Sequence, residues 1–274
     1  MRSLLASPLG FLIGLSLGAL GGGGSILAVP ALVYAAGQSP KHATTTSLVL
    51  VALTAMIGIV PHWRAGRVRV VAGTIFGLAG VGGSLLGSHW NRAVNPDALL
   101  LAFSALMLIA AYAMWRRVRR AQAGVPTTSL PLSSVGAAAA MPVPSSVRVD
   151  PATIARVIGA GTLVGLLTGF FGVGGGFVIV PALVLALGFT MPEAVGTSLL
   201  VITINSAVAL STRLQAGSIE WGTVIPFTVA SLLGVMVGSR LASTRDSTSL
   251  QRWFVALLVV VALYTAGRSA IALA

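Results

Sequence analysis

The sequence contains very few charged residues. They make up 8% of its 274 residues, whereas hydrophobic residues make up 56% and the mean hydropathy is +0.97. Soluble domains contain roughly 25% charged residues, so most of this chain cannot face water. A spanning helix needs about 20 apolar residues, which leaves room for roughly six to eight spans. The ~10-residue alternating segments of a membrane β-barrel are not seen. We therefore expect an all-α polytopic membrane protein.

Cysteine is absent, and acidic residues and histidines are scarce. The absence of cysteine excludes disulfides, thiolate metal sites and cysteine nucleophiles. The acidic residues and histidines all fall in loops or near the ends of predicted spans; they are Asp97, Asp150, Glu193, Glu220, Asp246, His42, His62 and His89. Proton relays, intramembrane proteases and metalloenzymes need such groups at mid-depth. We therefore expect no enzyme activity, no metal site and no cofactor, and we expect interfacial positions for the histidines.

The formal net charge is +12, but its distribution does not indicate a nucleic-acid-binding protein. The basic residues gather in short connections between apolar runs, chiefly Arg64, Arg67 and Arg69, then Arg116, Arg117, Arg119 and Arg120. Cationic connections of this kind stay on the cytoplasmic side during membrane insertion. The expected partners are the lipid bilayer and a small substrate. The sequence leaves the oligomeric state open, and a homo-oligomer is compatible with it.

The chain contains an internal duplication. A shift of 151 positions places GGGGSILAVPALVYAAG (21–37) over GVGGGFVIVPALVLALG (172–188) without a gap. The same shift aligns Phe76 with Phe227, and Gly83 and Gly87 with Gly234 and Gly238. Residues 1–115 are therefore predicted to form the first membrane repeat and residues 151–274 the second. The segment 116–150, rich in Pro, Ser, Ala and Arg, is predicted to be a flexible cytoplasmic linker.

Each repeat is predicted to contain the same series of apolar runs. They cover 7–20, 25–37, 43–61, 69–89 and 97–115 in the first repeat, and 153–171, 176–188, 193–212, 221–241 and 249–272 in the second. The two runs beside the first glycine cluster are each too short to cross a hydrocarbon core of about 30 Å. Either the pair forms a re-entrant hairpin, which leaves three full spans per repeat and makes the repeats inverted, or it forms one broken crossing, which gives eight crossings and parallel repeats.

Loop charge does not separate these two topologies, because both place the same number of basic residues in the cytoplasm. A second comparison favours inverted repeats. The basic residues Arg64, Arg67 and Arg69 align with Gln215, Ser218 and Glu220, so equivalent connections differ in charge. Such a difference is natural when the two connections lie on opposite sides of the membrane.

The glycine clusters are the main polar feature predicted at membrane depth. Gly21 to Gly24 in the first repeat, and Gly172, Gly174, Gly175 and Gly176 in the second, each open a helix that soon reaches a proline, Pro30 or Pro181. A helix that begins there presents free N–H groups and the positive end of its dipole, and glycine lets an anion approach the backbone. Paired interruptions of this kind indicate a transporter's binding site. Tight helix packing is the alternative, and we expect packing alone for the Gly83/Gly87 and Gly234/Gly238 pairs.

Neutral hydroxyl and amide side chains stand beside the glycine clusters. They are Ser25, Thr44, Thr45, Thr46 and Ser47 in the first repeat, and Thr197, Ser198, Thr203, Asn205 and Ser206 in the second. Such donors suit an oxyanion and avoid the desolvation cost of a buried cation, although any one of them can instead cap or join helices. We predict substrate binding by Gly21, Gly22, Gly23, Gly24, Ser25, Thr45, Thr46, Ser47, Gly172, Gly174, Gly175, Gly176, Thr197, Ser198 and Asn205, and a structural role for Pro30 and Pro181.

The doubled motif carries a family resemblance. It reads GVGGGFVIVPALVLALG…GTS in one repeat and GGGGSILAVPALVYAAG…TTS in the other, and it resembles the sulfite exporter TauE/SafE family over essentially the whole chain outside 116–150. The resemblance implies a permease of the bacterial inner membrane that exports sulfite, sulfoacetate or a similar organic anion. The first repeat has Gly22 where the second has Val173, and Ser25 where the second has Gly176. The two half-sites are therefore expected to differ. We expect a secondary transporter working by alternating access; a passive anion channel and a non-transporting membrane scaffold are the alternatives.

Overall fold

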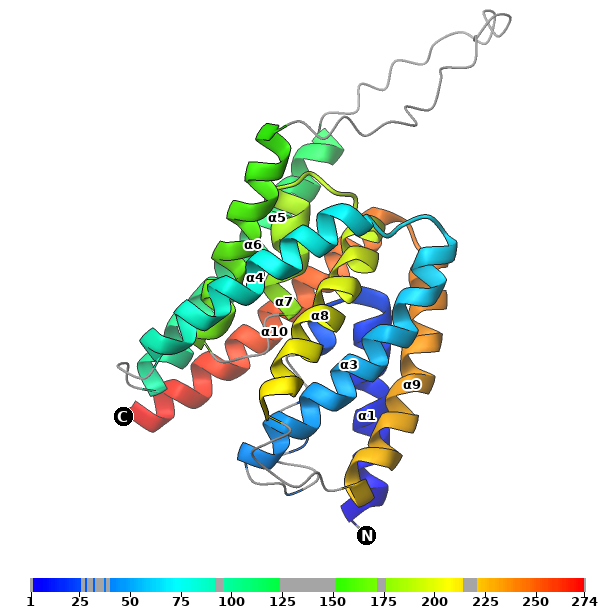
Figure 1. Cartoon of the computed structure of the whole chain (residues 1–274), viewed down its shortest axis with the longest axis vertical. Helices are drawn as coiled ribbons and strands as arrows, with labels where there is room; N and C mark the ends of the chain where they lie inside the picture. The colour runs from blue at the N-terminus through cyan, green and yellow to red at the C-terminus, as the bar shows by residue number, and fades with distance from the viewer. Residues whose placement is uncertain are drawn as a thin grey trace, which may run out of the picture.

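Helices account for all regular structure in the part of the chain that the structure describes. The structure is a computed structural model, and it describes residues 2–25, 28, 32, 37, 40–91, 96–123, 151–171, 176–213 and 221–273. The helices are α1 (Arg2–Leu20), α3 (Pro40–Arg64), α4 (Val70–Asn91), α5 (Pro96–Ala123), α6 (Pro151–Phe171), α7 (Gly176–Leu185), α8 (Met191–Arg213), α9 (Trp221–Thr244) and α10 (Ser247–Leu273) (Figure 1). The predicted apolar runs therefore have helices at the expected places, except 25–37, most of which lies outside the described residues.

Length and composition make seven of the described helical segments able to cross a membrane. They are Thr46–Arg64, Val70–Trp90, Leu101–Arg120, Pro151–Phe171, Met191–Leu210, Ile225–Thr244 and Ser247–Gly267. Two further segments, Pro8–Leu20 and Gly176–Leu185, are apolar but shorter. Large apolar side chains such as Leu85, Ile109 and Val260 face outward and are about two-thirds exposed, as contact with lipid requires. The chain is a multi-pass helical membrane protein.

The helix bundle has two ends, which we name upper and lower as Figure 1 is oriented. At the upper end α3 stops and α4 and α8 begin, and the Arg69 N–H donates to Thr197 Oγ1 at 3.1 Å. The end of α5 meets the beginning of α10 there as well, where Gln251 Nε2 donates to the Met114 carbonyl at 3.1 Å. Helix α1 begins and α10 ends at the lower end (Figure 1).

The first helix of each repeat packs along a helix of the other repeat. Along α1 and α9, which run parallel, Gly10, Gly14 and Gly18 face Phe227, Ser231 and Val235. Along α6 and α4, also parallel, Gly161, Gly165 and Gly169 face Phe76, Gly80 and Ser84. A Cβ atom on Gly14 would lie 1.9 Å from the Ser231 carbonyl oxygen, so only glycine permits this approach. The two sets of contacts are related by the same 151-residue offset that relates the repeats in sequence.

The predicted packing role of the second pair of glycine motifs is confirmed. A Cβ atom on Gly83 would lie 2.2 Å from the Thr162 carbonyl oxygen, and one on Gly234 would lie 2.1 Å from the Phe11 carbonyl oxygen. These glycines complete the α4–α6 and α1–α9 contacts from the other side.

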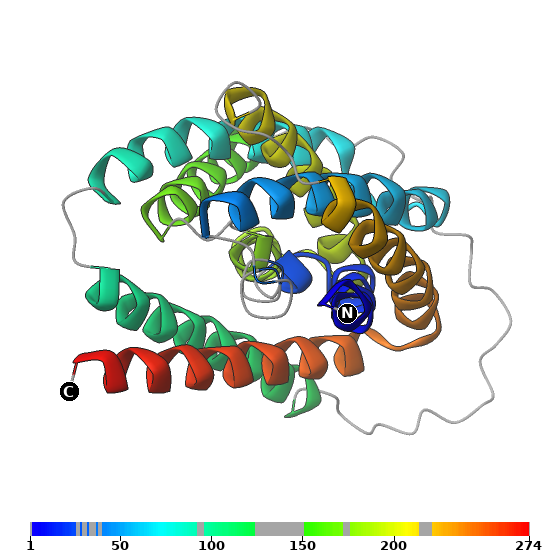
Figure 2. The ribbon, with the colours of Figure 1, turned by 90° about the horizontal axis from the view of Figure 1, so that it is seen from below.

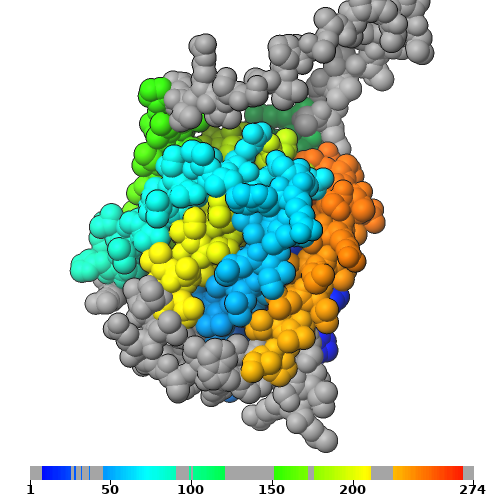
Figure 3. All heavy atoms as spheres, turned by 45° about the vertical axis from the view of Figure 1, so that its right-hand side comes forward, coloured from blue at the N-terminus to red at the C-terminus, as the bar shows by residue number. Residues whose placement is uncertain are grey.

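Helices α3 and α8 occupy equivalent positions in the two repeats, yet they run antiparallel. The end of α3 meets the beginning of α8, where a Cβ atom on Gly196 would lie 3.0 Å from the Cβ atom of His62. Helix α8 instead runs parallel to α4, along which Gly73 and Gly77 face Leu200 and Ile204. Figure 3 shows α4, α8, α3 and α9 side by side on one face of the molecule.

The chain reverses at the first glycine cluster. Gly21, directly after α1, has a φ of +69°, a left-handed conformation that favours glycine. A Cβ atom on Gly24 would lie 2.5 Å from the Ile13 carbonyl oxygen and 2.7 Å from the Leu17 nitrogen, so Gly24 lies back along α1. A straight helix would instead carry Gly24 about 16 Å away from Ile13. The chain therefore turns back along α1 between Gly21 and Gly24.

The second glycine-broken segment begins and ends at the upper end. Helix α6 starts there because it runs parallel to α4. Helix α7 finishes there, where the guanidinium of Arg117, near the end of α5, donates to the carbonyls of Val184 and Gly188. Figure 2 shows α7 and α1 between the layer of α3, α4, α8 and α9 on one side and the α5–α10 pair on the other.

Helix α5 extends into the segment that the sequence assigned to the linker. It ends at Ala123 instead of near 115, because the following Arg, Val, Ala and Gln residues are compatible with a helix. The arginines of this last part have partners: the Arg119 guanidinium lies 4.3 Å from the Trp115 ring centre, and that of Arg116 lies 5.8 Å from the Tyr112 ring centre. The remainder of the predicted linker, 124–150, lies outside the described residues.

Candidate functional site

The two glycine-broken segments contact each other at their tips. A Cβ atom on Gly22 would lie 1.5 Å from the Gly176 carbonyl oxygen, and one on Gly176 would lie 2.4 Å from Ser25 Oγ. A Cβ atom on Gly21 would lie 2.4 Å from Ser198 Oγ. We call these five residues the glycine junction. Both repeats contribute to it, and all of its members except the partly buried Ser25 are buried.

Hydroxyl and backbone groups make up the polar chemistry of the glycine junction. The Gly22 carbonyl accepts hydrogen bonds from the Ser25 N–H at 3.3 Å and the Ser25 hydroxyl at 2.7 Å. The Ser198 hydroxyl donates to the Val195 carbonyl at 2.8 Å. Helix α7 starts at Gly176, and the first N–H groups of a helix have no partner inside that helix. The described part of the junction contains no charged side chain.

The remaining predicted site residues divide into three groups. Gly23 and Gly24 line packing contacts, with Leu257 of α10 and with α1 respectively. Thr46 and Ser47 are buried on α3, and Thr197 is buried on α8 beside the backbone of Arg69. Gly172, Gly174, Gly175, Pro30 and the side chain of Thr45 lie outside what the structure describes, so their roles stay predictions.

Asn205 lies away from the described contacts of the glycine junction. Its amide nitrogen would be 3.8 Å from a Cβ atom on Gly80, where α8 meets α4, and its carbonyl oxygen is buried without a hydrogen-bond partner among the described residues. Pro181 is buried inside α7. Because proline has no N–H, the Phe177 carbonyl loses its helical partner.

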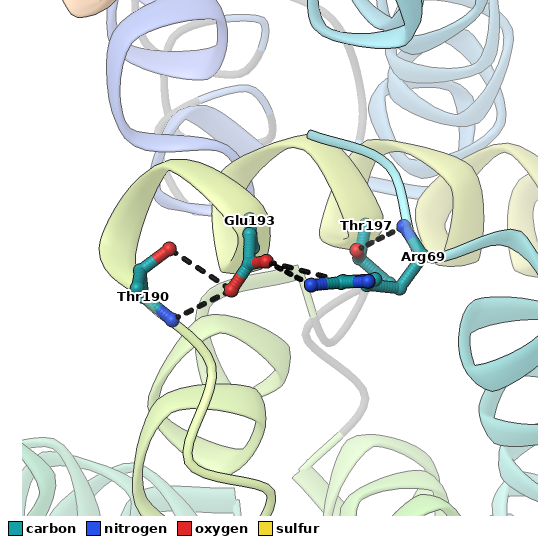
Figure 4. Close-up of polar contacts among 4 residues, drawn as sticks. All are labelled: Arg69, Thr190, Glu193 and Thr197. Atoms are coloured by element: carbon teal, nitrogen blue, oxygen red, sulfur yellow. Dashed lines mark hydrogen bonds and ion pairs between the residues drawn. The ribbon is translucent and has the colours of Figure 1, made fainter. Parts of the chain in front are cut away.

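A second polar cluster joins the repeats at the upper end (Figure 4). Arg69, just before α4, donates to Glu193 Oε1 from Nε at 3.1 Å and from Nη2 at 2.6 Å. Glu193 Oε2 accepts hydrogen bonds from the Thr190 N–H at 3.1 Å and the Thr190 hydroxyl at 3.0 Å. The Arg69 N–H also bonds Thr197 Oγ1. We call Arg69, Thr190, Glu193 and Thr197 the cross-repeat clamp, because it fixes the start of α4 to the start of α8.

The cross-repeat clamp was not predicted, although part of its signal is in the sequence. Thr190 and Glu193 have the spacing of a capping box, in which an acidic residue three positions after a threonine satisfies the start of a helix. Arg69 cannot be assigned to this box from sequence, since it comes from the other repeat. At the 151-residue offset Arg69 and Glu193 correspond to Glu220 and His42, so the charges are not repeated.

His62 is buried among the helices near the end of α3, and the interfacial position expected from the sequence stays a prediction. Its side chain is 2% exposed, and neither ring nitrogen has a hydrogen-bond partner within the described ranges. The connection after α3 folds back, with the Arg67 N–H donating to the His62 carbonyl at 2.9 Å. Gly196, which has no side chain, lets α8 of the other repeat approach the Cβ atom of His62. Among the described residues no group of three or more His, Asp or Glu side chains could hold a metal ion.

Two glycine-broken segments, one from each repeat, meet inside the multi-pass bundle. This arrangement is typical of a membrane transporter. The model of the sulfite exporter TauE/SafE family matches residues 6–265, and the chain belongs to this family. A "Probable membrane transporter protein" of Xylella fastidiosa (strain 9a5c) is 34% identical over 265 residues, which cover 95% of this chain and 93% of that protein.

More distant relatives carry similar names. The "Probable membrane transporter protein YunE" of Bacillus subtilis (strain 168) is 24% identical over 270 residues, covering 94% of this chain and 91% of that protein. The "Probable membrane transporter protein MJ0441" of Methanocaldococcus jannaschii is 34% identical over 112 residues, covering 39% of this chain and 42% of that protein. No solved structure matches the chain.

Proposed function

We propose that the chain is a secondary transporter that exports a small sulfur oxyanion, such as sulfite or sulfoacetate, or a similar organic anion, across the bacterial inner membrane. The observation that carries the proposal is the glycine junction, where the backbone of Gly22 contacts that of Gly176 and Gly21 lies against Ser198. Glycine leaves the amide groups accessible to an anion. The proposed activity is transport without catalysis or a cofactor.

The anion would be bound by backbone N–H groups and by serine hydroxyls. Ser25 and Ser198 each donate to a nearby backbone carbonyl, and a serine hydroxyl can rotate toward an approaching oxyanion instead. A hydrogen bond to a charged group is worth about 1.5–3 kcal/mol, more than one between neutral groups. Rotation toward the anion is therefore favourable, and a buried arginine is not needed at the junction.

We propose further that the repeats are inverted and that the upper end is cytoplasmic. The antiparallel course of α3 and α8 and the reversal at Gly21 support this arrangement. Most described arginines belong to connections or helix ends at the upper end: Arg64, Arg67, Arg69, Arg116, Arg117, Arg119, Arg120, Arg156, Arg240, Arg245 and Arg252. By the positive-inside rule that end faces the cytoplasm.

Alternating access would come from movement of two mixed units, α1 with α9 and α6 with α4. Each unit combines helices of both repeats through close glycine contacts, so each should move as one body. Movement at the glycine junction would then expose the anion to one side or the other. Export needs little further energy, because an inside-negative potential drives an anion outward by about 2.3 kcal/mol per charge per 100 mV.

The proposal is tested by sulfite efflux from proteoliposomes that contain the purified full chain. A thermal-shift screen with sulfite, sulfate, sulfoacetate, taurine and lactate first selects the anion that stabilises the protein. A saturable dependence of efflux on the internal concentration of that anion is the expected result. A rate that rises without saturation would indicate a channel, and the absence of efflux with every anion would indicate a scaffold. Either result contradicts the proposal.

A further inference from the structure

His62 is a buried titratable side chain whose ring nitrogens form no hydrogen bond with the described residues. The ring is 2% exposed, and both of its nitrogens lack a hydrogen-bond partner among the described residues. Leaving buried polar atoms unpaired is energetically costly, so such a position is seldom occupied without a use. Imidazole also changes its charge between pH 5 and 8.

The position of His62 links the glycine junction to the upper end. The Gly18 backbone lies next to the ring, although it forms no hydrogen bond of normal geometry with it. Gly18 precedes Gly21 by three residues, about 4.5 Å along a helix axis. On the other side, Gly196 contacts His62, and Ser198 of the junction follows two residues later. His62 therefore lies between the end of α1, which leads to Gly21, and the part of α8 that carries Ser198.

The described charged groups around His62 are mostly positive, so a protonated ring there needs a partner of opposite charge, such as a bound anion. Gly18 lies in the last turn of α1, where backbone carbonyls lack helical partners and the helix dipole is negative. Among the residues whose side chains the structure describes, the charged groups at this end of the surrounding elements are Arg64 at the end of α3, Arg67 and Arg69 in the α3–α4 connection, Glu193 at the start of α8 and Arg240 on α9. Glu193 is already paired with Arg69, so no described carboxylate is left to neutralise the ring permanently.

We propose that His62 is the proton-binding residue of the transport route, and that its protonation strengthens anion binding at the glycine junction. This inference rests on the proposed function and adds proton linkage to it. The imidazolium supplies a positive charge near the junction. An anion bound there in turn favours the protonated ring, because the two effects are reciprocal. In the sequence the equivalent position of the second repeat is Arg213, which is always charged.

The direct test is a histidine NMR titration of the purified full chain labelled with ¹⁵N-histidine. The chain has only three histidines, so loss of a signal in His62→Gln and in His89→Gln assigns the spectrum. Saturating sulfite, compared with chloride at equal ionic strength, should raise the midpoint of the His62 titration by about one pH unit, which corresponds to about tenfold coupling. The His89 midpoint should not move, since His89 is exposed near the end of α4. An unchanged His62 midpoint overturns the proposal.

A flux experiment separates failure of this inference from failure of the proposed function. Efflux by His62→Gln is divided by wild-type efflux at each pH, so that titration of sulfite itself cancels. The ratio should be about tenfold lower at pH 6 than at pH 8. Efflux by His62→Arg, whose side chain is always charged, should vary with pH only as sulfite itself titrates. Saturable wild-type efflux with a ratio that does not change with pH overturns the role of His62 alone, whereas no wild-type efflux overturns the transport proposal.

Discussion

Gly22 and Gly176, which belong to different repeats, are in backbone contact: a Cβ atom on Gly22 would lie 1.5 Å from the Gly176 carbonyl oxygen. This contact holds the two glycine-broken segments against each other inside the bundle. It brings the start of α7, with its unpaired N–H groups, beside the chain reversal that follows α1.

Replacement of Gly22 by alanine should separate the tips. The added methyl group cannot avoid the Gly176 carbonyl without moving backbone, and overpacking of this kind costs typically 1–3 kcal/mol or more. We expect a lower unfolding temperature and loss of anion efflux. Gly82→Ala is the matched control, because a Cβ atom at Gly82 meets nothing within 4 Å. Equal behaviour of the two variants would contradict the contact.

Cross-linking across the clamp should stop transport. The chain contains no cysteine, so Arg69→Cys with Glu193→Cys gives a defined pair without further changes. If α4 and α8 must separate at the upper end during each cycle, a short bifunctional maleimide should abolish efflux. The single-cysteine variants treated with the same reagent should remain active. Full activity of the cross-linked double variant would show that the clamp does not open.

Loss of the clamp's charges should affect stability little. The Arg69 side chain is 51% exposed, and an ion pair this exposed contributes about 0–1 kcal/mol. Arg69→Gln and Glu193→Gln should therefore unfold close to the wild-type temperature, as measured by thermal shift. Glu193→Gln keeps the capping geometry at Thr190 better than Glu193→Ala would, so a large loss in Glu193→Gln would mean that the pair carries more energy than its exposure allows.

Equivalent connections should lie on opposite sides of the membrane. Arg67 and Ser218 correspond at the 151-residue offset, and each can be replaced by cysteine in the cysteine-free chain. A membrane-impermeant maleimide added to intact cells should label Ser218→Cys, and Arg67→Cys should react only after permeabilisation. Labelling of both from the same side would show parallel repeats.

The positions of the helices could be predicted because the internal duplication is visible in the sequence. The 151-residue offset and the apolar runs gave the helices, and the contacts of Gly83 and Gly234 follow from small residues spaced four apart. The partner of each helix could not be predicted, because apolar faces do not encode which neighbour covers them. Gly10, Gly14 and Gly18 therefore went unrecognised as the α9 contact.

The candidate site was predictable in part for the same reason. The glycine clusters and Ser198 were identified from motif and register, and the structure brings Gly21, Gly22 and Ser198 together with Gly176. Asn205, which was predicted to bind substrate together with Ser198, lies instead beside Gly80. His62 is buried where α8 of the other repeat approaches it at Gly196, so its burial could not be predicted from the local sequence.

The central claim is that the anion binds at the glycine junction, and the Michaelis constant for sulfite efflux in Ser198→Ala tests it most directly. Ser104→Ala is the matched control: both serines are buried and donate to the carbonyl three residues earlier, but Ser104 lies on α5. A hydrogen bond to a charged ligand is worth about 1.5–3 kcal/mol, so Ser198→Ala should raise the constant at least about tenfold. Ser104→Ala should leave it within about twofold. Equal constants in the two variants would place the anion elsewhere.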